Sequence, residues 1–378
     1  MTSPDGERPR TASTVGPVRV VGTGLLGASV GLALRNHGVP VQLADPSRTA
    51  LALARDVGAG QPARDGDPEP ALVVVAAPPD VVAQVVAAEL VAHPQAVVTD
   101  VASVKGYVLA ELRAAGVDLR RYVGSHPMAG RERSGPSAAV PDLFVGRPWV
   151  IVDPGEADAQ ALLAVRALAV DLGAVPVAMG AAEHDAAVAT VSHVPQLVST
   201  LVAGRLRDAA PGALGLAGQG LRDVTRIAAS DPALWTTILA ANSAAVHREL
   251  VALRAELDVV VAALAAADEA DGPETVAPGA LGALARTLAA GNAGVARIPG
   301  KHGGTQRTYA LVSVLVPDSP GSLAALLAQI GEAGVNLEDL DLEHAAGRPV
   351  GIANVSVLPE SAEHLEQVLT EHGWKVVR

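Results

Sequence analysis

The sequence predicts an α/β protein in three parts: an N-terminal domain around a parallel sheet, an all-helical middle domain, and a small C-terminal domain of strands and helices. Three observations predict this organisation. From Val18 to about Val177, short β-branched runs alternate with alanine-rich stretches of helical length, which is typical of β-α-β units. After Met179 the strand pattern stops, and it returns only near the C-terminus. The 378 residues suffice for two or three domains, since about 150 residues is usual for one.

The N-terminal domain is expected over residues 17–180. Its candidate strands are VRVVG, VQLAD, LVVVAAP, AVVTDV, RYVGSH, RPWVIVD and AVPVAM. The segments between them are long enough for crossover helices, which favours a parallel sheet. Residues 1–16 are mostly polar and lack the apolar segment of a signal peptide, so we expect a disordered tail there.

The middle domain is expected over residues 181–292 and should be entirely helical. The predicted helices are Glu183–Arg207, Ala213–Ala229, Pro232–Ala267 and Pro278–Ala290. The third follows Asp231 and begins with a proline, which is a helix-start signal.

Two further segments complete the chain. Residues 293–307 are rich in glycine and of mixed charge, which indicates a linker. Residues 308–378 follow the order β-α-β-β-α-β. This is the order of a ferredoxin-like domain.

The composition narrows the classes of function. Hydrophobic residues make up 49% of the chain but aromatic ones only 2%, so the core must be packed with Ala, Val and Leu. The absence of cysteine excludes disulfides, thiol nucleophiles and zinc held by cysteines. A net charge of −12 argues against a nucleic-acid partner. The apolar runs carry polar or charged residues, so we expect no membrane-spanning helix and no membrane partner, and a cytoplasmic enzyme is the default.

A glycine-rich motif opens the first β-α unit. Gly22-Thr23-Gly24-Leu25-Leu26-Gly27 lies between a predicted strand and a predicted helix, as a Rossmann-type dinucleotide site requires. Gly22 permits a tight turn, Gly24 lets the backbone approach a pyrophosphate, and Gly27 lets the helix pack on the strand. The helix N-terminus adds N–H groups for the anion. We therefore expect the motif, including Leu25 and Leu26, to bind the cofactor.

An acidic residue indicates which dinucleotide binds. Asp45 ends the next predicted strand, where a carboxylate accepts both ribose hydroxyls and repels a 2′-phosphate. NAD is therefore favoured over NADP. Arg48 in the same loop leaves NADP open, because an arginine there accommodates a 2′-phosphate. A glycine-rich turn that binds nothing is the remaining alternative.

Two polar segments follow later strands of the sheet, Asp100–Gly106 and Gly124–Gly130. Residues just past the carboxyl ends of strands face the ligand crevice of such a sheet, so His126 is expected beside the nicotinamide. A dehydrogenase that oxidises an alcohol needs a base for the hydroxyl proton, and a neutral imidazole suits this task at pH 7. The alternative is an ordinary loop histidine before a proline.

The helical region adds a third group of polar residues. His193 lies among apolar neighbours in a predicted helix. It is either a pocket residue or a core histidine hydrogen-bonded to Gln196 or Thr200, which share its face. Asp223 and Arg226 are three residues apart and share a helix face, so the carboxylate can orient the guanidinium. A surface ion pair is the alternative.

These motifs together resemble one family. GTGLLG with Asp45, DVASVKG, GSHPMAGRERSG, EHDAAVATVSHVPQ and RDVTRIAASDPALW occur in the order and approximate spacing of the prephenate/arogenate dehydrogenases of tyrosine biosynthesis. The resemblance spans about Val18 to Ala267. It implies a NAD-dependent oxidative decarboxylation of a cyclohexadienol, in which hydride leaves ring C4 and the ring carboxylate departs as CO2. Aromatisation drives the loss of CO2, so no metal is required. A homodimer formed through the helices is also implied.

The resemblance assigns roles to residues of this chain. His126 matches the histidine that accepts the C4 hydroxyl proton, and Ser103 matches the serine beside that hydroxyl. Arg226 matches the arginine that holds a substrate carboxylate. The other matches are His193 and Trp235 in the pocket, Asp223 beside the arginine, Glu132 at the pocket mouth, and Lys105, which we group with the cofactor-binding residues without a role of its own.

The chain departs from the family at two positions. Arg131 stands where many relatives have a small polar residue, and Gln196 stands where many have histidine. Either change can alter the choice between prephenate and arogenate, so both are candidate substrate-binding residues. Prephenate, converted to 4-hydroxyphenylpyruvate, is the first choice. Arogenate, which gives tyrosine directly, is the alternative.

Two loops of the C-terminal segment resemble the signature of an ACT regulatory domain. They are Asp318–Leu323, which contains Gly321, and Gly334–Leu337, which contains Asn336. In that family such loops bind a free amino acid, and tyrosine as a feedback inhibitor is the hypothesis here. A turn and helix start without a ligand is the alternative.

Two competing functions are weighed against this one. A 6-phosphogluconate-type or β-hydroxyacid-type dehydrogenase has the same plan but relies on a lysine in the helical domain, and no lysine lies between Lys105 and Lys301. A non-catalytic sensor of NAD or of an amino acid has no use for His126, Ser103 and Arg226 together.

Overall fold

The structure is a computed structural model that describes residues 12–131, 133–268, 279–299, 309–344 and 350–377. The chain divides into two compact units, Met1–Leu253 and Arg254–Arg378. Glu132 and residues 300–307 of the predicted linker lie outside the described residues.

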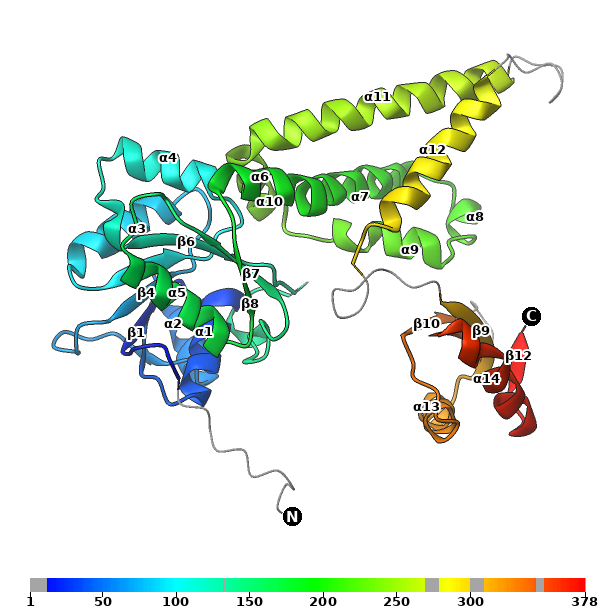
Figure 1. The fold of residues 1–378 in the computed structure, drawn as a ribbon, viewed down its shortest axis with the longest axis horizontal. Coiled ribbons are helices and arrows are strands. Elements are labelled where there is room, and N and C mark those ends of the chain that lie inside the picture. Colours follow the sequence, from blue (N-terminus) through cyan, green and yellow to red (C-terminus); the bar gives the residue numbers. More distant parts are fainter. Residues whose placement is uncertain (1–11, 132, 269–278, 300–308, 345–349, 378) are drawn as a thin grey trace. The chain divides into compact units, whose positions relative to one another are not determined.

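An eight-stranded sheet forms the centre of the first unit, in the order β3-β2-β1-β4-β5-β6-β7-β8 (Figure 1). The strands are β1 (Val18–Val21), β2 (Val41–Ala44), β3 (Gln61–Pro62), β4 (Leu72–Val75), β5 (Val97–Asp100), β6 (Tyr122–Pro127), β7 (Pro148–Val152) and β8 (Val175–Ala178). β1 pairs in parallel with both β2 and β4, so Val18 lies opposite Val41 on one side and Leu72 on the other. The strand order reverses at β1, where sheets of this kind bind their ligands.

All seven predicted strands are present, and the two-residue β3 is an addition. The prediction of a wholly parallel sheet was wrong, because β6 and β7 run antiparallel, with His126 opposite Val150. Parallel neighbours need a crossover connection, usually a helix. Between β6 and β7 the described residues hold only the 3₁₀ turn Pro136–Ala138. The chain therefore returns in the opposite direction.

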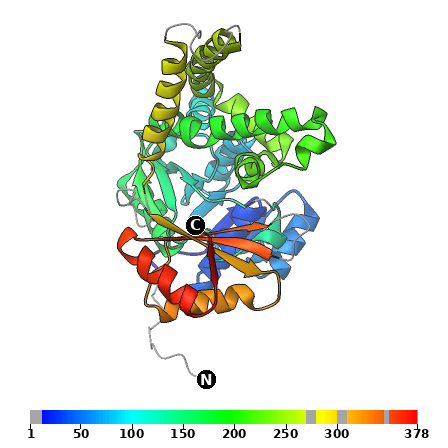
Figure 2. The same ribbon diagram turned by 90° about the vertical axis from the view of Figure 1, so that its right-hand side faces the viewer.

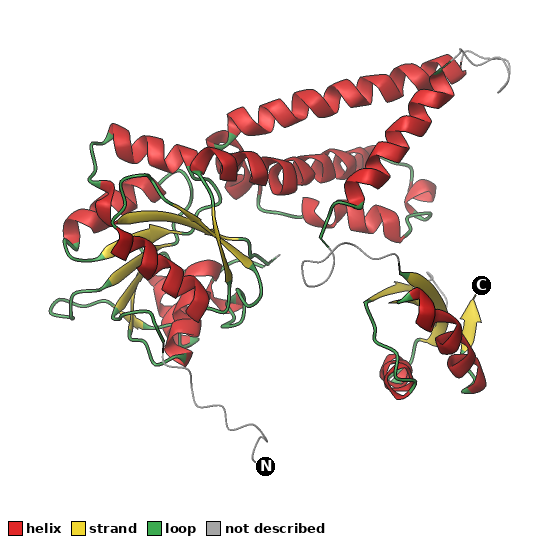
Figure 3. Cartoon of the chain, viewed as in Figure 1, coloured by secondary structure: helices red, strands yellow, loops and turns green. Residues whose placement is uncertain are grey.

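Helices cover both faces of this sheet (Figure 3). They are α1 (Leu25–Asn36), α2 (Arg48–Asp56), α3 (Val82–Ala92), α4 (Gly106–Ala114) and α5 (Ala159–Asp171). Leu34 of α1 and Val165 of α5 belong to one buried cluster, and Val86 of α3 and Leu112 of α4 belong to the other. Every residue of the central strand β4 is buried. The all-aliphatic sequence LVVV suits a strand that is covered on both faces.

The segment before β1 differs from the predicted tail. The backbone N–H and the hydroxyl of Thr14 both donate to Asp171 Oδ2, at 2.6 and 2.7 Å. Thr14 is buried, and Asp171 is the last residue of α5. These hydrogen bonds hold Thr14 against the domain. The prediction of a disordered tail was therefore wrong at Thr14. Residues 1–11 of the predicted tail lie outside the described residues.

After β8 the chain is helical, as predicted, but it is divided into more pieces. The elements are α6 (Ala181–Val188), a π-helical turn (Ala189–His193), α7 (Val194–Arg205), α8 (Pro211–Leu214), α9 (Gln219–Thr225), a 3₁₀ turn (Arg226–Ala228), α10 (Pro232–Ala241), α11 (Ser243–Asp268) and α12 (Ala280–Val295). The π-helical turn interrupts the predicted helix Glu183–Arg207. It lies just before Pro195, which has no N–H and whose ring clashes with the carbonyl four residues earlier in a regular α-helix.

The other predicted helices also differ from the structure. The helix predicted at Ala213–Ala229 is broken between Gly215 and Gly218, where two glycines lower the helix propensity. The helix predicted at Pro232–Ala267 is broken at Asn242, which separates α10 from α11. The last helix, α12, continues to Val295 and so enters the predicted linker.

One helical stretch, Ala181–Asp208, is long and apolar enough to cross a membrane by length and composition alone. The expectation that no segment would pass this test is therefore corrected. A single such stretch is weak support for a membrane span, because core helices of soluble proteins pass the same test. Here it carries His184 and His193, both buried and hydrogen-bonded inside the first unit.

The C-terminal part of the second unit follows the predicted β-α-β-β-α-β order. Its elements are β9 (Ala310–Pro317), α13 (Ser322–Glu332), β10 (Asp339–His344), β11 (Val350–Val357), α14 (Pro359–Glu371) and β12 (Lys375–Val377). The sheet order is β10-β11-β9-β12, with every pair antiparallel. Alternate residues of β9, such as Val312 and Val314, are buried against Leu326 of α13 and Leu365 of α14. Figure 2 shows both helices on the same face of this sheet.

Candidate active site

The glycine-rich motif lies at the point where the strand order reverses. Gly22 follows β1 with a φ of +94°, and a Cβ there would come within 2.4 Å of the carbonyl oxygen of Ala76, the residue after β4. Gly27 packs so closely that a Cβ would lie 1.9 Å from the Gly22 carbonyl oxygen. Only glycine fits at either position. The roles that the motif predicts for Gly22, a tight turn, and for Gly27, close packing of the helix on the strand, are therefore visible in the backbone.

Gly24 is different, because nothing lies within 4 Å of the position that its Cβ would take. It is the N-cap of α1, and no side chain caps that helix. The first N–H groups of α1 thus face open space on the side of Gly24, as a pyrophosphate site requires. These residues fit a dinucleotide.

Asp45 directly follows β2 and is tied to the glycine loop. Its Oδ2 accepts hydrogen bonds from the Thr23 N–H at 2.6 Å and the Thr23 hydroxyl at 2.8 Å, and its Oδ1 accepts from the Ser47 N–H at 2.8 Å. A carboxylate has about four acceptor sites, so one remains. Asp45 therefore has room for one ribose hydroxyl, not for the two that we expected.

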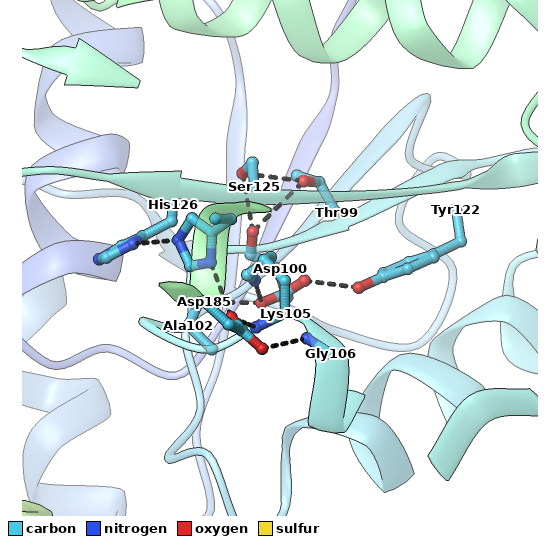
Figure 4. A network of polar contacts seen from close by, with 10 residues as sticks. Thr99, Asp100, Ala102, Lys105, Gly106, Tyr122, Ser125, His126 and Asp185 are labelled. Carbon is cyan, nitrogen blue, oxygen red and sulfur yellow. Dashed lines mark hydrogen bonds and ion pairs between the residues drawn. The ribbon is translucent and has the colours of Figure 1, made fainter. Parts of the chain in front are cut away.

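A buried polar cluster supports the loop that carries Ser103 (Figure 4). The carboxylate of Asp100, the last residue of β5, pairs with the Lys105 ammonium and accepts hydrogen bonds from the Tyr122 hydroxyl at 2.7 Å and the Ala102 N–H at 2.9 Å. Burial lowers the pKa of Lys105, although the neighbouring Asp100 opposes the shift. Burial also raises the pKa of Tyr122.

This burial changes the role of Lys105. Its side chain is wholly enclosed, so the ammonium holds Asp100 and not an exposed cofactor. Our grouping of Lys105 with the cofactor-binding residues does not agree with this placement. The loop that it anchors leaves Ser103 partly exposed between β5 and α4.

The predicted base, His126, lies near the carboxyl end of β6 and is partly exposed. Its Nδ1 is 2.9 Å from Nε2 of His184, and Nδ1 of His184 is 2.8 Å from Oδ1 of Asp185. Burial holds the pKa of His126 well below 6.5, and the neighbouring His184 and Lys105 lower it further. His126 is therefore neutral at pH 7, as a base must be.

Asp185 also holds the start of α4. Its two oxygens accept the backbone N–H groups of Lys105 at 2.9 Å and Gly106 at 2.8 Å. Burial would raise the pKa of Asp185, but the hydrogen bonds from His184 and from these N–H groups lower it. His184 and Asp185 belong to the motif EHDAAVATVSHVPQ, but no role was predicted for either residue. Their position directly after β8 was the available signal.

His193 is a buried, hydrogen-bonded histidine. Its Nδ1 is 3.1 Å from Nδ2 of Asn242, whose Nδ2 also donates to the Asp185 carbonyl at 2.8 Å. The expected partners Gln196 and Thr200 were wrong, because Thr200 donates instead to the Gln196 carbonyl. Burial lowers the pKa of His193 to about 4. The ring of Trp235 meets it edge-on, with centroids 5.9 Å apart.

Of the remaining predicted substrate residues that the structure describes, Arg226, Asp223 and Arg131 are exposed and Gln196 is buried. Arg226 begins the 3₁₀ turn after α9 and is exposed. Asp223 accepts a hydrogen bond from Gln219 at 2.9 Å, so its orientation of Arg226 stays a prediction. Gln196 is buried, with its Oε1 3.4 Å from the Ser230 hydroxyl. Arg131 is exposed and donates to the Ala138 carbonyl, whereas Glu132 lies outside the described residues.

Comparison with known proteins places this site in a family. The family model for the nucleotide-binding domain of prephenate dehydrogenase matches residues 30–178, and the model for its dimerization domain matches residues 180–275. The chain belongs to the prephenate dehydrogenase family. It is therefore an enzyme of the NAD-dependent oxidoreductase class.

Several relatives extend this finding. A Streptomyces niveus protein named "Probable prephenate dehydrogenase NovF" is 40% identical over 94% of this chain and 98% of its own length. Because so little of this chain is left out, the match continues past residue 275 into the C-terminal β-α-β-β-α-β segment. The prephenate dehydrogenase of Bacillus subtilis is 32% identical over 60% of this chain and 64% of its own.

Two solved structures share the fold of about three quarters of the chain. The prephenate dehydrogenase of A. aeolicus, in complex with hydroxyphenyl propionate and NAD+, has a TM-score of 0.63 at 25% identity, covering 75% of this chain and 99% of that one. The Synechocystis arogenate dehydrogenase has a TM-score of 0.58 at 26% identity, covering 74% and 98%. The family therefore includes enzymes named for either substrate.

Proposed function

We propose that this enzyme catalyses the NAD-dependent oxidative decarboxylation of prephenate to 4-hydroxyphenylpyruvate. The observation that carries the proposal is the environment of His126, a partly exposed imidazole whose pKa is held well below 6.5. It lies on β6, next to the strand that leads into the Ser103 loop. As a biosynthetic enzyme, the protein would act in the cytoplasm.

The residues suit the chemistry of the substrate. When bound, NAD+ accepts the hydride from ring C4. His126 takes the proton of the C4 hydroxyl as the C–O bond becomes a carbonyl, and the Ser103 hydroxyl orients that oxygen. The bond between the ring and its carboxylate then breaks, its electron pair enters the ring, and CO2 leaves as the ring becomes aromatic.

The backbone around Gly24 and the N-terminus of α1 would hold the pyrophosphate. Asp45 would accept one ribose hydroxyl and repel a 2′-phosphate. Since Arg48 begins α2 three residues later, its charge partly offsets that repulsion. We therefore propose NAD as the preferred cofactor, and the activity with NADP should be measured for comparison.

Arg226 is the proposed partner of a substrate carboxylate, because a guanidinium binds carboxylates with two parallel hydrogen bonds. His193 and Trp235 would form one wall of the proposed pocket, since their rings are in edge-on contact. The alternative substrate is arogenate, which carries an amino group on the side chain. It is kept because Gln196 stands where many relatives have histidine, and because an arogenate dehydrogenase is among the similar structures.

The test is the rise of NADH or NADPH absorbance with each of the two substrates and each of the two cofactors. The proposal expects the largest kcat/KM for prephenate with NAD+. A larger kcat/KM for arogenate would replace prephenate by the alternative. No turnover with either substrate would overturn the function and favour a non-catalytic sensor.

We also propose that the enzyme is a homodimer. Exposed apolar side chains repeat along one face of α11, at Leu253, Leu257, Val261 and Leu264. A spacing of three to four residues places them on one stripe of the helix, and such stripes mark protein interfaces. Residues 180–275 match the family's dimerization domain. Sedimentation equilibrium at micromolar concentration tests this, and a monomer would refute it.

Regulation by tyrosine through an ACT domain completes the proposal. Support comes from the β-α-β-β-α-β order and from the two predicted loops. Gly321 is the N-cap of α13 with a φ of +91° and open space at its Cβ position, and Asn336 is exposed and bonded to Glu338. Calorimetry with tyrosine should show binding that Asn336→Ala weakens. Unchanged activity in saturating tyrosine would exclude the regulation.

A further inference from the structure

A chain of three side chains runs from the predicted base into the protein. His126 on β6 contacts His184 on α6, and His184 contacts Asp185 beside it. We infer that His184 and Asp185 are positioning residues that fix the tautomer of His126, leaving Nε2 without a proton and turned toward the substrate. This inference rests on the proposed function of His126 as the base.

The direction of the hydrogen bonds follows from Asp185. A carboxylate only accepts, and the oxygens of Asp185 already accept two backbone N–H groups at the start of α4. Nδ1 of His184 must therefore carry the proton in their 2.8 Å contact. In a neutral imidazole the other nitrogen is then an acceptor. Nε2 of His184 thus accepts from Nδ1 of His126, and Nε2 of His126 is left with its lone pair.

The arrangement is held on every side. His184 is fully buried, and both of its ring nitrogens are engaged, one by His126 and the other by Asp185. Gly106 makes the approach possible, because a Cβ there would come within 2.7 Å of Asp185 Oδ2. Asp185 therefore joins three elements: α6, the start of α4 just after the Ser103 loop, and, through His184, the strand β6. The relative position of the two proposed catalytic groups, His126 and Ser103, depends on this one carboxylate.

The surroundings of His126 keep it neutral before the reaction. Burial opposes a positive charge on the imidazole, and the Lys105 ammonium, at the start of α4, opposes it further. When His126 takes the substrate proton, it keeps that proton, and its positive charge is stabilised by the hydrogen bond to His184 and by the Asp185 carboxylate behind it. The logic is that of a buried carboxylate that orients a catalytic imidazole in serine proteases.

Acid should disable the site. A proton on Nε2 of His126 removes the lone pair that takes the substrate proton. Because burial, first of all, holds the pKa of His126 well below 6.5, this loss of activity should begin only below that value.

Three substitutions separate the tautomer from mere packing. His184→Leu removes the acceptor, and His184→Gln keeps an acceptor within reach of His126. Asp185→Asn removes the negative charge; because Oδ1 accepts from both His184 and the Lys105 N–H, the remaining oxygen should stay on that side and the tautomer of His184 should be kept. His93→Gln is the control, because His93 makes comparable contacts with Glu69 and Glu89 at the other end of β5. All are made in the full chain.

Two readouts are used. Histidine-selective ¹⁵N NMR reports which ring nitrogen of His126 carries the proton, without any turnover. Steady-state kinetics give kcat, the KM for NAD+ and the pH profile of kcat/KM. General-base catalysis is typically worth about 10²–10⁴-fold, so His184→Leu should lower kcat by about 10²-fold or more while the KM for NAD+ changes less than about twofold.

The wild type should have an unprotonated Nε2 on His126. His184→Leu should lose kcat and show an altered pH profile, and His184→Gln should recover to within about tenfold of wild type. Asp185→Asn should keep Nε2 of His126 unprotonated but lower kcat, because the negative charge that stabilises a protonated His126 is gone. A proton on Nε2 in the wild type would overturn the inference, as would equal losses in the Leu and Gln variants. If His184→Leu does not fold, the wild-type spectrum and the other two variants decide. If the wild type turns over neither substrate, the proposed function fails while the spectrum still decides the tautomer.

Discussion

The ammonium of Lys105 and the carboxylate of Asp100 form an ion pair in which both side chains are fully buried. The two residues flank the loop that carries Ser103. The Asp100 carboxylate also accepts a hydrogen bond from the Tyr122 hydroxyl on β6. The members of the ion pair come from the end of one strand and the start of the next helix. The ion pair therefore joins the stability of the domain to the shape of its active site.

Replacing Lys105 by Met should destabilise the enzyme strongly. The substitution leaves the Asp100 carboxylate buried without its counter-charge, which typically costs about 3–5 kcal/mol. The free energy of unfolding from urea titration measures this loss. Arg207→Ala is the control, since the Arg207–Asp208 pair is 84% and 72% exposed and such pairs contribute about 0–1 kcal/mol. Equal losses in the two variants would contradict the structural role of Lys105.

Two glycines of the cofactor loop should respond differently to alanine. Gly24→Ala meets open space and a normal φ of −67°, so Tm should hardly change, while the methyl group meets the pyrophosphate and weakens NAD+ binding by about tenfold or more. Gly27→Ala forces the methyl against the Gly22 carbonyl and should cost about 1–3 kcal/mol of stability. Thermal melts and fluorescence titration with NADH distinguish them. A destabilised Gly24→Ala would show that this face of the loop is not open.

Replacing the proposed base, His126, and replacing the proposed carboxylate-binding residue, Arg226, should change different kinetic constants. His126→Asn should lower kcat by about 10²–10⁴-fold with little change in KM. Arg226→Ala should instead raise the KM for the substrate, because it removes a charge-assisted contact worth about 2–5 kcal/mol. Initial rates over a range of substrate concentrations give both constants. If the two effects are exchanged, the two roles are exchanged as well.

Stability should fall as the pH is lowered from 6.5 toward 4. The pKa of His193 is about 4 in the folded state, against an ordinary value near 6.5 in the unfolded chain. Between these values the unfolded state binds more protons, so the free energy of unfolding decreases with decreasing pH. His126, whose pKa is also lowered, acts in the same direction. Melting temperatures across this window should drop less steeply in His193→Asn, and an unchanged slope would exclude His193 as a cause.

Local patterns predicted much of the fold and part of the site. β-branched runs marked seven strands, and the glycine motif placed the cofactor loop at the end of β1. His126 was predicted as the base because residues at strand ends face the ligand crevice. Periodicity and turn chemistry are properties of a few neighbouring residues, so they are visible without a structure.

Contacts between distant segments were not predictable in this way. His126 and His184 are 58 residues apart in the chain, and Lys105 and Asp185 are 80 apart. Similarly, Asn242 and not the nearby Gln196 became the partner of His193. The antiparallel direction of β7 relative to β6 was not predicted for the same reason, because the direction of a strand depends on how the connection before it crosses the sheet.

The sequence by itself determined the strands and helices, the cofactor loop, the family, and the residue types that perform the chemistry. Only the tertiary structure decided that Lys105 is a buried counter-charge, that Asp45 has a single free acceptor site, and that Asp185 orients the base through His184. The physical reason is that residue type sets what a side chain can donate or accept, whereas the packing of α6 against α4 beside the end of β6 sets which partner it meets.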